Sequence, residues 1–84
     1  MEILRDLRQR HIDAYFPLLR AYGVPAEQLS SPEYSGRVVR CAATCGIVTG
    51  ITAEEVDDML PGLVIKIAKQ VNEAVAEALT IPPD

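Results

Sequence analysis

Residues 49–62 read TGITAEEVDDMLPG, and this stretch decides the fold. Thr52 and Glu55 have the spacing of a capping box, in which the Thr hydroxyl accepts a hydrogen bond from the Glu amide and the Glu carboxylate accepts one from the Thr amide. Ile51 and Val56 lie at the two positions of a hydrophobic staple. Pro61 cannot continue this helix but suits the first position of another. The stretch therefore predicts a short capped helix over residues 53–59 and a new helix from residue 61.

Downstream of this stretch, residues 61–79 have the spacing of an amphipathic helix. One stripe is apolar, and charged residues occupy the opposite side. The stripe consists of Leu60, Val64, Ile67, Ala68, Val71, Ala74, Val75 and Ala78. Two consecutive prolines follow, so residues 80–84 are expected to form an extended tail.

Upstream, a second helix is expected over about residues 35–49, after the start pattern Ser31-Pro32 and before the stop Gly50. Its apolar residues cover two opposite sides. Val38, Cys41, Ala42 and Cys45 share one side, and Val39, Ala43 and Ile47 share the other. A helix that is apolar nearly all round is buried nearly all round. Either it is the central helix of a bundle, or one side is an interface with another chain.

The first helix is expected over about residues 2–22, because apolar residues recur there every three or four positions. Pro17 lies inside this pattern and predicts a kink, or a break near Phe16. Gly23 is the expected stop, and residues 23–35 form a connector.

These elements define a single all-α domain over residues 1–84. It is a small bundle of three main helices (about 2–22, 35–49 and 61–79) plus the short capped helix at 53–59. Residues 1–22 form its N-terminal helix, residues 36–79 its helical core and residues 80–84 its tail.

Composition excludes several classes of function. The formal charge is −4, from 12 acidic and eight basic residues, whereas nucleic-acid binding requires clustered positive charge. A helix-turn-helix that used Arg37 and Arg40 is therefore disfavoured. No apolar run is long enough to span a membrane. Apolar residues make up 49% of the chain, which leaves some of them to contact a partner.

No arrangement of residues indicates catalysis. His11 is the only histidine, and it lies at the edge of an apolar helix face, where packing is the simpler role. Cys41 and Cys45 are four residues apart on one helix, so they lack the further ligands of a zinc site and behave as small buried apolar residues. We therefore expect no enzyme, no cofactor and no metal.

The order of elements from Val38 to Leu79 resembles the helical part of the tail assembly chaperones of long-tailed bacteriophages. The resemblance rests on the small-residue helix CAATCGIV (residues 41–48), the turn TGITAEEVDDM (residues 49–59) into an acidic helix, and the final amphipathic helix. It covers roughly half of the chain. Many members of that family open with strand-like segments, whereas residues 1–22 read as helix here.

The resemblance implies a non-enzymatic phage protein of the host cytoplasm. Its relatives coat the apolar helical tape-measure protein during tail morphogenesis and help to recruit tail-tube subunits. We expect a homo-oligomer whose candidate contacts to protein partners are Val39, Ala43, Ile47, Leu63 and Ile65. The alternative is a small phage or bacterial regulatory module that inhibits one host protein.

Overall fold

The computed structural model describes residues 1–80, and the remaining tail, expected to be extended, lies outside the described residues. Three α-helices and the 3-10 helices between them account for most of the described residues, which confirms a small, mostly helical fold. The elements in chain order are β1 (Glu2–Ile3), α1 (Gln9–Ala21), the 3-10 helices η1 (Ala26–Gln28) and η2 (Pro32–Tyr34), α2 (Ser35–Thr44), β2 (Val48–Thr49), the 3-10 helix η3 (Glu54–Asp58) and α3 (Pro61–Leu79).

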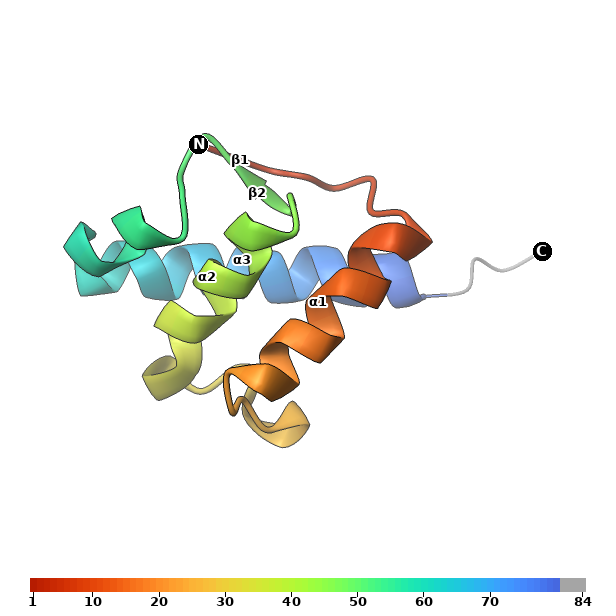
Figure 1. Cartoon of the computed structure of the whole chain (residues 1–84), viewed down its shortest axis with the longest axis horizontal. Helices are drawn as coiled ribbons and strands as arrows, with labels where there is room; N and C mark the ends of the chain where they lie inside the picture. The colour runs from red at the N-terminus through yellow and green to blue at the C-terminus, as the bar shows by residue number, and fades with distance from the viewer. Residues whose placement is uncertain (81–84) are drawn as a thin grey trace.

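Helix α3 runs along the longest dimension of the molecule, and α1 and α2 cross it on one side (Figure 1). Helix α2 is the centre of the fold, because it contacts α1, α3, β2, η2 and η3. The core lies where these elements meet. Its largest fully buried side chains are Tyr15, Ile47, Ile67, Val38, Val39, Val48, Val71 and Cys41.

The expected helix over residues 2–22 is wrong in its first two turns. Residues Glu2 and Ile3 form a short antiparallel ribbon with Val48 and Thr49. The amide of Leu4 then donates a hydrogen bond to the Ile47 carbonyl at 2.7 Å. Apolar spacing alone could not reveal this pairing, because it depends on a partner more than 40 residues away.

Helix α1 begins at Gln9 because His11 caps it. The Arg8 amide donates to Nδ1 of His11 at 2.9 Å, and the Arg8 carbonyl accepts from the His11 amide at 3.0 Å. The helix continues through Pro17, so the expected break near Phe16 does not occur. It ends as predicted at Gly23, whose φ of 74° is left-handed.

Helix α2 ends at Thr44, five residues before the expected end at residue 49. Gly46 has a φ of 85°, and the Ile47 amide donates to the Ala42 carbonyl at 2.9 Å. This six-residue bond is the Schellman arrangement that closes a helix on a left-handed glycine. Gly50, the expected stop, is also left-handed, but it turns the chain after β2, and a Cβ there would lie 3.0 Å from the backbone of Met1.

The capping box is confirmed in both directions. The Glu55 amide donates to the Thr52 hydroxyl at 3.3 Å, and the Thr52 amide donates to a Glu55 carboxylate oxygen at 3.2 Å. The helix that follows is 3-10 in geometry over Glu54–Asp58. Pro61 is the first residue of α3, as expected, and Leu60 precedes it as the N-cap.

Candidate protein-binding surfaces

The residues that sequence analysis proposed as protein contacts do not form one surface. Val39 and Ile47 have no exposed surface, so they belong to the core. Ala43 is half-buried. Both sides of α2 are covered within one chain, which settles the two alternatives for this helix in favour of a central position. The β1–β2 ribbon accounts for part of this burial, and the sequence pattern did not predict it.

Leu63 and Ile65 are accessible but point to different sides of α3. Leu63 is 43% exposed, and Ile65 is half-buried. Residues two apart on a helix lie about 200° apart around its axis, so the two side chains cannot contact the same partner surface.

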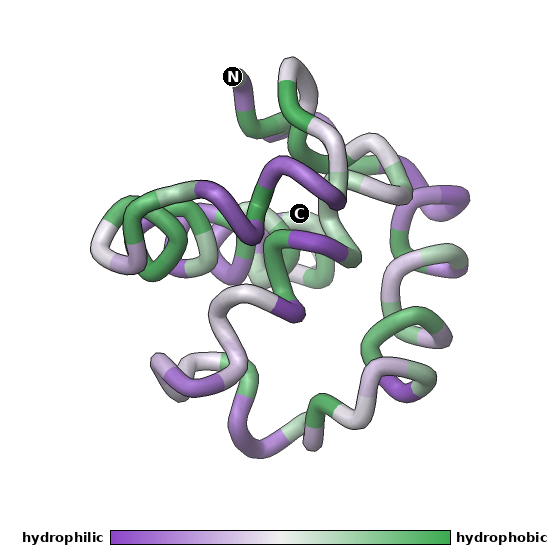
Figure 2. The backbone as a smooth tube through the Cα atoms, turned by 60° about the vertical axis from the view of Figure 1, so that its left-hand side comes forward, coloured by the Kyte–Doolittle hydropathy of each residue, from purple (hydrophilic) through white to green (hydrophobic). Residues whose placement is uncertain are grey.

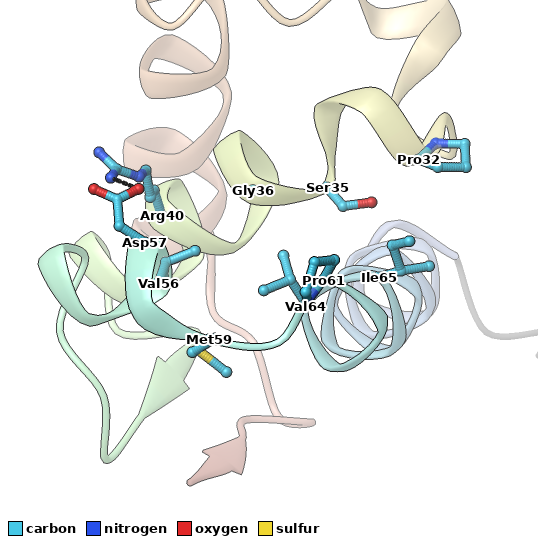
Figure 3. A pocket seen from close by; sticks show the side chains of 10 residues that line it. All are labelled: Pro32, Ser35, Gly36, Arg40, Val56, Asp57, Met59, Pro61, Val64 and Ile65. Atoms are coloured by element: carbon cyan, nitrogen blue, oxygen red, sulfur yellow. Dashed lines mark ion pairs between the residues drawn. The ribbon is translucent and has the colours of Figure 1, made fainter.

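Ile65 lines a shallow groove between the start of α3, the start of α2 and η3 (Figure 3). Val56, Met59 and Pro61 supply apolar walls, while Ser35 and the ion pair between Arg40 and Asp57 supply polar ones. The mixed lining makes this groove a weaker candidate for an apolar partner than the more apolar surfaces between α1, η1 and the second half of α3.

Leu60 is the most exposed large apolar side chain among the described residues, at 75%. Its carbonyl accepts hydrogen bonds from the amides of Leu63 and Val64 at 3.0 and 3.1 Å, so the first turn of α3 holds its backbone in place. Four acidic residues lie just before it in η3. Figure 2 shows hydrophobic and hydrophilic positions alternating along the helices of the molecule.

A small apolar pocket lies between the second half of α1 and η1, with a volume of about 180 Å³. We call it the Arg20 pocket, because Arg20 is the one charged residue among those that form its walls in the described part of the chain. The other lining residues are Phe16, Leu19, Val24, Ala26 and Leu29.

An apolar groove adjoins this pocket and follows the second half of α3. We call it the α3 groove. The Asn72 side-chain amide donates to the Leu29 carbonyl at 2.9 Å and so ties the connector to α3 along the groove. Leu79 at its end is 55% exposed. Its lining is mostly apolar but also includes the carboxylate of Glu27; the lining residues are Phe16, Ala26, Glu27, Leu29, Ser30, Asn72, Val75, Ala76 and Leu79.

The sequence pattern did not single out the pocket and groove residues as a binding site. Phe16 falls outside the main stripe of α1, and Leu79 lies beyond the last residue of the α3 stripe. The available indication was Leu29, a large apolar residue between the polar residues Gln28 and Ser30 in the connector. Such a residue needs apolar neighbours, and the fold supplies them from α1 at the Arg20 pocket and from α3 at the groove.

The two cysteines are free thiols in apolar surroundings. Burial raises the pKa of the Cys41 thiol to about 11, and burial also raises the pKa of Cys45. The Cys45 thiol donates a hydrogen bond to the Cys41 carbonyl at 3.0 Å. Both side chains are therefore protonated near neutral pH, a state that suits packing and not nucleophilic attack or metal ligation.

Within residues 1–80, no three His, Cys, Asp or Glu side chains gather closely enough to hold a metal ion. None of the helices in the same range combines the length and apolar character needed to cross a membrane. No protein-family model, curated protein or solved structure matches the chain. The proposals that follow therefore rest on the geometry and on the sequence pattern.

Proposed function

We propose that the chain is a non-enzymatic assembly chaperone of a long-tailed phage, acting in the host cytoplasm, and that it binds an apolar helical segment of the tape-measure protein in the α3 groove. The observation that carries the proposal is this groove, whose apolar walls stay accessible in a chain that otherwise covers its core. The resemblance of residues 38–79 to tail assembly chaperones supplies the class of client.

The shape and chemistry of the groove suit a helix better than an extended strand. An amphipathic helix places an apolar residue every three or four positions into a groove, and side chains alone make the contact. A strand would need unpaired backbone groups at a sheet edge, and the groove walls are helices and a 3-10 turn.

Burial of Leu79 and its apolar neighbours would contribute the free energy of binding. Covering a Leu side chain that is otherwise exposed contributes about 1.5–3 kcal/mol, and Leu79 is about half exposed in the free chain. Several such contacts along a client helix would provide binding without a cofactor or a charged site.

The proposal predicts opposite results for two matched substitutions on α3. Leu79→Asp introduces a charge into the groove and should abolish binding of the client, whereas Leu63→Asp places the same charge on another side of α3 and should leave binding intact. The measurement is co-expression of the full chain with the tape-measure protein of the same phage, followed by quantification of soluble client that co-purifies.

Circular dichroism of both variants provides the control for folding. Equal co-purification by the wild-type chain and Leu79→Asp would contradict the groove. A client lost with Leu63→Asp and kept with Leu79→Asp would place binding on the side of α3 that bears Leu63. No interaction with any of the three proteins would contradict the chaperone function itself.

A further inference from the structure

We infer that the Arg20 pocket is the docking site for Leu60 of a second copy of this chain, so that copies join head to tail. The inference rests on the proposed function in one respect, which is that a chaperone coating a filament must contact its neighbours. It goes further by assigning the two halves of that contact to named residues.

The leucine half of the contact is preorganised. Leu60 lies between the end of η3 and Pro61, and the hydrogen bonds from Leu63 and Val64 to its carbonyl fix its backbone. Its side chain is 75% exposed and so is free to contact another molecule. Because little backbone ordering accompanies docking, most of the burial of this side chain is available for affinity.

The pocket half matches a leucine in size and polarity. An apolar cavity of about 150 Å³ accommodates a benzene molecule. The Arg20 pocket has about 180 Å³ and is lined by Phe16, Leu19, Val24, Ala26 and Leu29. One leucine side chain therefore fills it, with little room for a larger group.

Charge identifies the second copy as the occupant. Asp57 and Asp58 precede Leu60, and both are exposed. Asp57 pairs with Arg40 in the same molecule, whereas Asp58 has no ion-pair partner among residues 1–80. At the pocket, Arg20 is exposed in the last turn of α1 and has no such partner in that range either. A docked Leu60 would bring Asp58 toward Arg20.

The two halves lie apart on the molecule, so the contact connects separate copies. Figure 1 shows η3 and the start of α3 at the left-hand end, while η1 and the second half of α1 lie below the middle of the molecule. A contact between two different surfaces is heterologous, and it generates rings or open filaments instead of stopping at a dimer.

Each half can be blocked without touching the core. Leu60→Asp removes the docking side chain and replaces it with a hydrated carboxylate that the apolar pocket walls cannot solvate, and Arg20→Glu places a negative charge at the pocket opposite Asp58. Loss of one buried leucine should weaken association about 10- to 150-fold. Arg10→Glu is the matched control, because it makes the same charge change on an exposed arginine in the first turn of α1.

The test is light scattering on a sizing column with the two blocked variants, first separately and then mixed. Each variant should be monomeric alone. Their mixture should form a one-to-one dimer, because the Arg20→Glu chain has an intact leucine and the Leu60→Asp chain has an intact pocket. Arg10→Glu should associate like the wild-type chain.

Three outcomes would overturn the inference. They are association of either variant alone to the wild-type mass, a mixture that stays monomeric while the wild type associates, and an Arg10→Glu chain as weakened as Arg20→Glu. In each of these cases, the proposed function would still be supported if Leu79→Asp abolished co-purification of the client. If the wild-type chain also failed to bind the client, both this inference and the proposed function would be contradicted.

Discussion

At the scale of single residues, Tyr15 presents an unusual combination. Its side chain is completely buried, and its hydroxyl has no hydrogen-bond partner among the described residues. Its ring packs edge-on against Phe16, with centroids 5.6 Å apart. The ring therefore supports the core while the hydroxyl opposes folding, because a buried polar group without a partner costs about 1–3 kcal/mol.

Tyr15→Phe should accordingly raise the free energy of unfolding by about 1 kcal/mol, which corresponds to about 4–8 °C in a domain of this size. Burial raises the pKa of Tyr15 above its ordinary value of 10.0. A raised phenol pKa contributes stability below pH 10 that is lost as pH rises further, so the advantage of the variant should grow above pH 10.

Thermal unfolding at pH 7 and pH 10.5 measures both effects. Tyr22→Phe serves as the control, because Tyr22 is 38% exposed and its hydroxyl can reach water. A Tyr15→Phe chain less stable than the wild type at pH 7 would show that the hydroxyl has a partner in solution.

At the scale of elements, helix ends depend on glycines whose roles differ. Gly46 and Gly36 both have open space where a Cβ would lie. Gly46 has a φ of 85° and closes α2, whereas Gly36 lies inside α2 and has no such positive φ. Any difference between Ala substitutions at the two positions therefore reports backbone conformation and not crowding.

Gly46→Ala should destabilise the fold by about 1–2 kcal/mol, because an L-residue in the left-handed region is strained. Gly36→Ala should stabilise it by about 0.4–1 kcal/mol, because it restricts the unfolded chain without strain. Chemical denaturation of the two variants measures the difference. Equal effects of the two substitutions would contradict a left-handed end of α2 at residue 46.

Most features that depend on neighbouring residues could be predicted from the sequence, whereas features that depend on distant residues could not. The capping box, Pro61 and Gly23 act over a few neighbouring residues, and all three predictions are confirmed. The early end of α2 was missed because Gly46 looked like one more small residue in an apolar helix. The β1–β2 ribbon was missed because strand pairing joins residues far apart in the chain.

At the scale of the whole molecule, burial decides where a partner can bind. A pattern of apolar residues indicates which helix faces are buried, but it cannot tell burial by the same chain from burial by another. Val39 and Ile47 illustrate this, since elements of the same chain cover them. The two most exposed large apolar residues of the described part, Leu60 and Leu79, instead lie at the two ends of α3.

Charge is also divided along the chain. Residues 1–40 contain six arginines and five acids, and residues 41–84 contain two lysines and seven acids. The Arg20 pocket draws its lining from the first group, and the segment before Leu60 belongs to the second. This division favours contact between unlike parts of two copies over contact between like parts.

The most direct test of self-association is light scattering on the wild-type chain, from about 10 μM to about 1 mM, the range in which weak contacts dissociate. We predict a mass that climbs beyond two chains as concentration rises, and that falls at high salt because the charges are screened. A mass of 9.2 kDa at every concentration would contradict self-association and favour a regulator that binds a single protein.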